Sequence, residues 1–155
     1  MPKAGIQFST KDEWFTPKEI VDKFGPFDYD PATNVELAQK FGIPNYDTIE
    51  TNGLTTDWTC HKKIWCNPPF TKKFDFLKKA VESGKHVFFL LPIETLTTKK
   101  FHEIVKVPYI VHVPNGRIKF TDVTGGGGSS PAFGSVVLEF GKDVHSGIKH
   151  WELYG

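Results

Sequence analysis

Cysteine is scarce in this sequence of 155 residues, which contains only Cys60 and Cys66. Two cysteines make no disulfide framework, and their spacing does not match a zinc-ligand pair. No apolar run approaches the roughly 20 residues that cross a bilayer, and the N-terminus lacks the apolar core of a signal peptide. We therefore expect a cytoplasmic protein with buried thiols and no membrane contact.

The sequence also has almost no excess of charge of either sign, because 19 Lys and Arg are balanced by 18 Asp and Glu. A chain with a net charge of +1 exerts no general attraction on nucleic acid, so any contact with DNA depends on local basic patches. The six histidines are scattered without a partner one helical turn away, and there is no Gly-x-x-x-x-Gly-Lys phosphate loop. We expect no metal site, and a hydrolytic triad gains no support.

Helical and strand periods alternate along the first two thirds of the chain. Helices are expected between Thr16 and Gly25, with Thr16 as N-cap and Pro17 in the first position, between Thr33 as cap and Gly42, and over 72–83 and 96–105. Strands are expected over 27–30, 63–66, 87–91 and 109–113, of which 87–91 is continuously apolar, as in a strand buried on both faces. This alternation predicts βαβ units and an α/β fold with a mostly parallel sheet.

The final third of the chain has a different pattern. Residues 117–120 and 135–140 alternate like strands and bracket the glycine-rich segment 124–131. That arrangement predicts an antiparallel pair at the edge of the sheet, joined by a mobile loop. Residues 1–12 are polar and are expected to form a flexible arm, and we expect the whole chain, 1–155, to make a single domain.

The motif Asn67-Pro68-Pro69-Phe70 lies where a strand ends and a helix is expected to begin. In an open α/β sheet, ligands bind at the carboxyl ends of the strands. Two prolines fix two φ angles and remove two backbone donors, which leaves a rigid corner that presents acceptors. These acceptors are the side-chain oxygen of Asn67 and the carbonyl of Pro68, and Phe70 adds a flat apolar surface.

This corner suits methyl transfer to the exocyclic amine of a base. The lone pair of such an amine is delocalised into the ring, and two acceptors that bond both N–H groups would free it for attack on a sulfonium methyl. An aromatic face would stack the base, which must first be flipped out of a duplex. The alternative is an ordinary Pro-Pro turn, but average residue usage gives the tetrapeptide roughly a one-in-a-thousand chance in a chain of this length.

The motif and six further segments resemble one family, the phage-type DNA N6-adenine methyltransferases, and more broadly the amino-methyltransferases with an Asn/Asp-Pro-Pro-aromatic motif. The further segments are residues 12–17, 27–32, 52–58, 91–92, 116–120 and 131–140. The resemblance implies a Rossmann-like S-adenosylmethionine-dependent methyltransferase fold. It also implies methyl transfer to adenine N6 in DNA by a phage or prophage enzyme that protects DNA against restriction in the host cytoplasm, with Asn67, Pro68, Pro69 and Phe70 as the catalytic residues.

The resemblance also implies a set of cofactor-binding residues for S-adenosylmethionine. The set consists of Trp14, Thr16, Pro17, Asp30, Pro31, Ala32 and Asp57. Within it, Asp30 would pair with the ammonium of the methionine part, and Asp57, with Trp58 beside it, would face the adenine. From residue type alone, Asp30 is equally a helix cap, and the tryptophans are core residues.

The sequence departs from the wider group of methyltransferases in two places. The turn at 30–34 contains no glycine, so the backbone must approach the cofactor in another way. The acidic residue that usually follows the second strand and holds the ribose has no clear match, and Asp47 and Glu50 are the candidates.

Basic residues beside the motifs are the candidate DNA contacts. Lys72 and Lys73 stand at the expected start of a helix, where their charge opposes the macrodipole unless a phosphate lies nearby. Arg117 and Lys119 are expected on one face of a strand. An ordinary solvated surface is an equally good explanation of all four.

Three other functions stay open. They are methylation of cytosine N4, methylation of adenine in RNA, and a catalytically silent protein that binds DNA or the cofactor. Asn at position 67 favours adenine, since the related cytosine enzymes commonly have Ser there. The sequence leaves the choice between monomer and dimer open.

Overall fold

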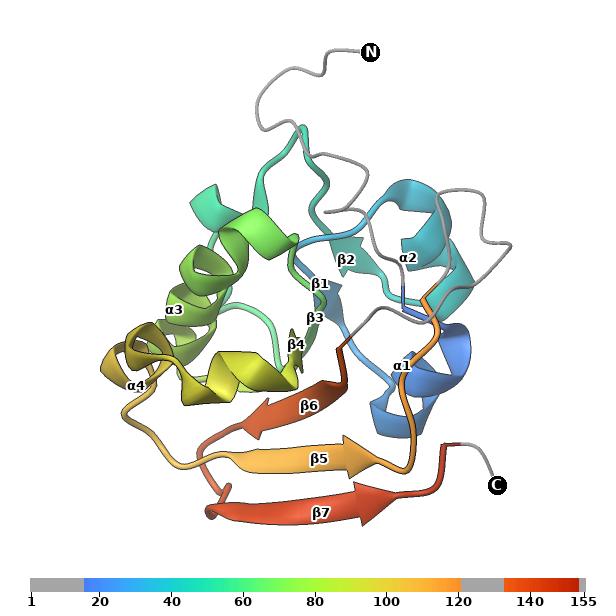
Figure 1. Ribbon diagram of the computed structural model, residues 1–155. Helices are drawn as coiled ribbons and strands as arrows, with labels where there is room; N and C mark the ends of the chain where they lie inside the picture. Colours follow the sequence, from blue (N-terminus) through green and yellow to red (C-terminus); the bar gives the residue numbers. More distant parts are fainter. Residues whose placement is uncertain (1–15, 121–132, 154–155) are drawn as a thin grey trace.

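The computed structural model describes residues 16–120 and 133–153 of the chain. Strands in this part form one sheet (Figure 1): β1 (Tyr29–Asp30), β2 (Asn45–Tyr46), β3 (Lys63–Cys66), β4 (His86–Pro92), β5 (Ile110–Pro114), β6 (Ser135–Phe140) and β7 (Gly147–Trp151). Their order across the sheet is β2-β1-β3-β4-β6-β5-β7. From β2 to β4 the neighbours run parallel, whereas β6 runs antiparallel to β4 and to β5. The predicted α/β class, with a mostly parallel sheet and antiparallel pairing, is confirmed.

Helices cover both faces of the sheet (Figure 1). On one side lie α1 (Lys18–Phe24) and α2 (Val35–Phe41), and on the other lie α3 (Lys73–Ser83) and α4 (Lys99–Ile104). The described residues also contain the short 3-10 helices η1 (Gly53–Thr55), η2 (Phe70–Lys72) and η3 (Ile93–Thr97). None of the helices in the described residues is long and apolar enough to cross a membrane.

The central strand β4 separates two hydrophobic cores. Val87, Phe89 and Leu91 point to the side of α3 and α4, while Phe88 and Leu90 point to the side of α1. All five are at most 5% exposed, as expected of a continuously apolar strand that is covered on both faces. Residues that complete the two cores include Leu77 and Phe101 on the first side and Ile20 and Val21 on the second.

The starts of the first two helices differ by one residue from the prediction. Pro17, with an extended ψ of 144°, is the N-cap of α1 instead of its first residue, so Thr16 is not the N-cap. Asn34 caps α2 in place of Thr33, because the Asn34 Oδ1 accepts a hydrogen bond of 2.9 Å from the Leu37 amide. The glycines predicted to end helices do so: Gly42 and Gly84 in the left-handed conformation, and Gly25 with an extended backbone.

The predicted strand over residues 117–120 is wrong. Residues 117–119 belong to no strand, and β6 pairs with β4 over six positions and with β5 over three. The alternation that suggested a strand is still visible in burial, because Ile118 and Phe120 are buried while Arg117 and Lys119 are exposed. Phe120 forms an isolated β-bridge, and residues 117–119 show the strand-like period because an extended segment packs one side on a core.

Two observed strands had no counterpart in the prediction. β2 has two residues, which is too short for a periodic signal, and the first four residues of β7 are exposed, so its sequence has no alternation of apolar and polar positions. The predicted arm at 1–12, the loop at 124–131 and Trp14 lie outside the described residues.

Gly53 in η1 packs directly against the turn that follows β1. A Cβ atom at this position would lie 2.1 Å from the carbonyl oxygen of Pro31 and 2.8 Å from its Cβ. The carbonyl of Gly53 also accepts a hydrogen bond of 2.8 Å from the indole N–H of Trp58. Because Gly53 has no side chain, the backbone of η1 can pack in direct contact with the 30–34 turn.

We expect Gly53→Ala to lower the free energy of unfolding by about 1–3 kcal/mol, the range for overpacked interiors. The added methyl group would clash with backbone atoms of Pro31, so the turn at Pro31 must shift to accommodate it. Gly147→Ala is the matched control, since a Cβ there meets nothing within 4 Å, and it should change stability by less than about 0.5 kcal/mol. Urea unfolding of both variants measures the difference, and equal midpoints would contradict the close packing.

Candidate active site

The Asn67–Phe70 corner begins directly after β3, at the carboxyl end of the parallel strands. Pro68 and Pro69 are buried, and Asn67 and Phe70 are half-buried. Pro69 is the N-cap of η2, and α3 begins at Lys73, one residue after the predicted start. The predicted position of the motif, between a strand and a helix, is therefore observed, with a 3-10 turn inserted.

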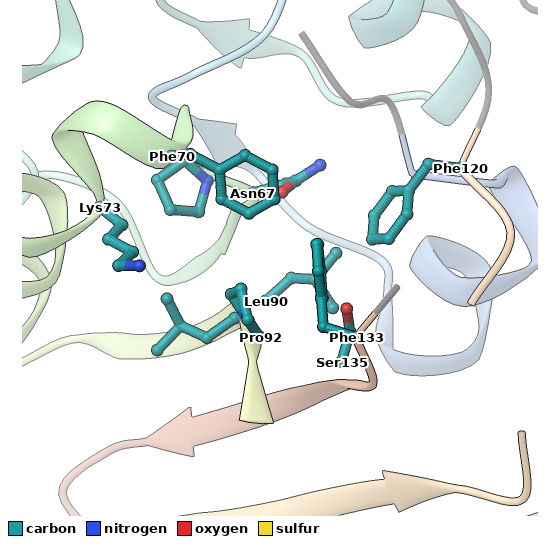
Figure 2. Close-up of a pocket in the computed structure, with 10 residues that line it drawn as sticks. Asn67, Phe70, Lys73, Leu90, Pro92, Phe120, Phe133 and Ser135 are labelled. Atoms are coloured by element: carbon teal, nitrogen blue, oxygen red, sulfur yellow. The ribbon is translucent and has the colours of Figure 1, made fainter. Parts of the chain in front are cut away.

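A hydrogen bond ties this corner to the N-terminal segment. The Asn67 Nδ2 donates to the Thr16 Oγ1 over 2.9 Å, and Thr16 is 3% exposed. The bond turns the nitrogen of the Asn67 amide toward Thr16, and Figure 2 shows the amide oxygen on the side of the Phe70 ring. Thr16, expected from the resemblance near the cofactor, thus contacts the predicted catalytic asparagine.

A pocket opens beside the corner (Figure 2). Counted together with the open solvent at its mouth, the space is about 330 Å³. The rings of Phe70 and Phe133 meet edge to face, with centroids 5.4 Å apart. The residues that line the pocket are Asn67, Pro68, Phe70, Lys73, Leu90, Leu91, Pro92, Phe120, Phe133 and Ser135.

Six of these ten residues were absent from the predicted site. Leu90, Leu91 and Pro92 end β4, Ser135 begins β6, and Phe120 and Phe133 flank a stretch outside the described residues. These residues could have been predicted only from the pairing of Pro92 with Ser135, which joins β4 to β6. No local pattern reports a pairing between segments so far apart in sequence.

Asp30 ends β1 and is 2% exposed. Its Oδ1 accepts a hydrogen bond of 3.0 Å from the Ala32 amide, and no ion pair to it is formed among the described residues. Burial raises the pKa of the Asp30 carboxyl to about 7, against the smaller lowering effect of the Ala32 N–H. Because Asn34 caps α2, Asp30 holds its own turn and is not the helix cap. It is a desolvated carboxylate that a ligand cation would stabilise.

Of the two acidic candidates after the second strand, Asp47 lies beside the Asp30 turn. The Tyr29 hydroxyl donates to its Oδ2 over 2.5 Å and the Thr56 hydroxyl over 2.9 Å, and its backbone N–H donates to the Asp30 carbonyl. Burial and the Asp47 hydrogen bond raise the pKa of Tyr29 well above its ordinary value, so the phenol stays a donor. Glu50 is exposed.

Asp57 and Trp58 have local roles in the structure. The exposed carboxylate of Asp57 accepts hydrogen bonds from the amide and the hydroxyl of Thr59, at 2.9 and 2.6 Å. These bonds lower the pKa of Asp57. Trp58 is 1% exposed and packs in the core of α3 and α4. A contact of Asp57 with the cofactor stays a prediction.

The four basic candidates differ in their relation to the pocket. Lys73 lines it, and Lys72 precedes Lys73 as the N-cap of α3. Arg117 and Lys119 are exposed on the segment that carries the pocket residue Phe120. Within the described ranges, no three His, Cys, Asp or Glu side chains are grouped as metal ligands.

Three comparisons connect this architecture with known proteins. A family model described as DNA N-6-adenine-methyltransferase (Dam) matches residues 3–149. A protein of Escherichia phage T1 named DNA N-6-adenine-methyltransferase is 34% identical over an alignment of 98 residues, and the match covers 57% of this chain and 39% of the phage protein. The chain therefore spans well under half the length of that relative.

The third comparison concerns the fold alone. A solved structure from Listeria monocytogenes, described as a class I S-adenosylmethionine-dependent methyltransferase, superposes with a TM-score of 0.50 at 14% identity. The match covers 98% of this chain and 68% of the other chain. The Rossmann-like methyltransferase fold is thus confirmed, and the chain belongs to the DNA N-6-adenine-methyltransferase (Dam) family.

Proposed function

We propose that this chain transfers a methyl group from S-adenosylmethionine to N6 of adenine in DNA. One observation carries the proposal: the Asn67–Phe70 corner, with the amide of Asn67 oriented by Thr16, lines a pocket at the carboxyl end of the sheet. The continuous sheet supports residues 1–155 acting as one domain, and the similarity to the phage T1 protein supports a phage or prophage origin and a place of action in the host cytoplasm.

The corner acts on the amine through its acceptors. The Asn67 Oδ1 and the Pro68 carbonyl accept the two N–H groups of the flipped base and draw the nitrogen toward tetrahedral geometry. Their positions are preorganised, since Thr16 holds the Asn67 amide and the proline rings fix the backbone. The ring of Phe70 provides the stacking surface, and Phe133 at its edge limits how the base can tilt.

The residues after β1 fit S-adenosylmethionine. Bound S-adenosylmethionine supplies an electrophilic methyl group on a sulfonium sulfur. Asp30, buried and without a cation among the described residues, would hold the ammonium group of its methionine part, with Pro31 and Ala32 forming the adjoining turn. Thr16 and Pro17 would border the same site from the N-terminal side.

DNA would meet the mouth of the pocket. Lys72 and Lys73 at the start of α3, and Arg117 and Lys119 beside Phe120, supply positive charge on two sides of it. Contacts of this kind position the phosphate backbone without reading sequence. We propose these four residues as the backbone contacts.

One experiment tests the function. The protein is incubated with methyl-labelled S-adenosylmethionine and unmodified DNA or RNA, and the product is digested to nucleosides and identified. We expect label in N6-methyldeoxyadenosine. Label in N4-methyldeoxycytidine or in methylated RNA would assign another target, and bound cofactor without any transfer would indicate a silent binding protein.

Removal of the acceptor in Asn67→Ala is expected to lower kcat by about 10²–10³, the usual effect of losing one preorganised hydrogen-bond partner of the transition state. The side chain is half-buried at the pocket, so folding should be retained. Single-turnover transfer measures the loss and thermal unfolding checks the fold. Wild-type turnover by a folded Asn67→Ala protein would overturn the assigned role.

Thr16→Val removes the acceptor of the Asn67 amide while keeping a similar shape, and we expect kcat to fall about tenfold because the amide loses its orientation. Thr16→Ser keeps the hydroxyl and should restore most of the rate. The affinity for cofactor, measured by calorimetry, separates this positioning role from direct cofactor binding. A pure loss of affinity with unchanged kcat would contradict the positioning role.

The raised pKa of Asp30 predicts a pH dependence of cofactor affinity. Above about pH 7 the carboxyl is ionised and can pair with an ammonium group, and below it the carboxyl is neutral. Since α-amino groups keep their proton up to about pH 7.7, the affinity for S-adenosylhomocysteine should fall about tenfold per pH unit from pH 7 to pH 5. Calorimetry across this range measures it.

Asp30→Asn serves as the control for that titration. The variant should bind weakly, with no pH dependence between pH 5 and 7. In the unliganded wild type, the native state holds a proton on Asp30 that the unfolded state releases above its pKa of 3.8, so the contribution of this group to stability falls as pH rises toward 7. The same pH dependence of affinity in both proteins would exclude Asp30 as the ammonium partner.

A further inference from the structure

Ser135 places a hydroxyl in the pocket that the Asn67–Phe70 corner does not account for. It is the first residue of β6, pairs with Pro92 at the end of β4, and is 4% exposed. Its hydroxyl makes no hydrogen bond to the residues that the structure describes. In Figure 2 its oxygen points toward the side of the pocket on which Asn67 and Phe120 lie.

The oxygen of Ser135 does not belong to the fully buried polar atoms that lack a partner, since it opens into the pocket, where a ligand can accept its hydrogen bond. The rest of the wall around Ser135 is apolar, being formed by Leu90, Pro92, Phe120 and Phe133. A ligand in the pocket would therefore find one neutral donor on this wall, across from the acceptors of the corner. A single polar group in an apolar wall is the usual means by which a pocket selects its ligand.

Adenine has unpaired hydrogen-bond acceptors that could bind this donor. Its amine is flanked by two ring acceptors, N1 and N7, and neither is satisfied by Asn67 or Pro68, which take the amine protons. Two other side-chain donors line the pocket: the Asn67 Nδ2 already donates to Thr16, and the Lys73 ammonium lies 5.4 Å from the centroid of the Phe74 ring, in a cation–π contact. Ser135 is thus the donor that remains for a ring nitrogen.

Resting on the proposed function, we propose that the hydroxyl of Ser135 donates a hydrogen bond to a ring nitrogen beside the amine of the flipped adenine. The bond orients the base in its plane, while Phe70 restricts it from above. Ser135 is then a specificity residue, since it favours bases that present an acceptor beside the amine and leaves its hydroxyl unpaired on bases that do not.

The test compares the wild type with Ser135→Ala on oligonucleotides that carry adenine, 1-deazaadenine or 7-deazaadenine at the target position, once nucleoside analysis and sequencing have located it. The wild type should lose about ten- to a hundredfold in kcat/KM on one of the two analogues. Ser135→Ala should lose a similar factor on adenine and no further activity on that analogue. The exposed Ser146→Ala is the matched control and should behave as the wild type.

Each outcome decides between the proposals. Equal rates of the wild type on all three bases would overturn the role of Ser135, whatever the variant does. A loss of rate on the analogues that is the same in Ser135→Ala as in the wild type would also overturn it. In both cases the methyltransferase activity itself would stand. Absence of transfer by the wild type to adenine would instead overturn the proposed function, and the role of Ser135 with it.

Discussion

The parallel alignment of β1, β3 and β4 is the constraint on which the site depends. Because these strands run in the same direction, their carboxyl ends meet at one edge of the sheet, which brings Asp30, Asn67 and Pro92 to the same side of the molecule. Burial on both faces maintains the alignment, with Ile64 and Trp65 of β3 at most 1% exposed. Reversal of one strand would carry its terminal residue to the opposite edge.

The same edge carries two polar groups that the described part of the protein does not fully satisfy. Asp30 is a desolvated carboxyl without a cation, and Ser135 has a hydroxyl that opens into the pocket without a hydrogen-bond partner there. Burial of Asp30 opposes folding, whereas the hydrophobic cores on either side of β4 favour it. The two groups lie on different strands, β1 and β6, with β3 and β4 between them. This separation is what two ligands placed side by side along the edge would require.

Predictions from sequence were most accurate where the physics is local. The Asn67–Phe70 corner could be recognised because its prolines constrain their own backbone, and β4 because its apolar run must be buried on both faces. Predictions were wrong where contacts with a distant segment determine the local structure. Thr16 was expected to cap α1, but it accepts a hydrogen bond from Asn67, and residues 117–119 alternate in burial without forming a strand.

By itself, the sequence determined the α/β class, the glycines that end α2 and α3, and the rigid corner with its acceptors, since each follows from the conformational limits of a few neighbouring residues. Tertiary structure alone decided that β6 enters the sheet between β4 and β5. That placement sets Ser135 beside Pro92 and completes the pocket. The physical reason is that strand pairing between distant segments depends on how whole faces are buried together, which no short stretch of residues encodes.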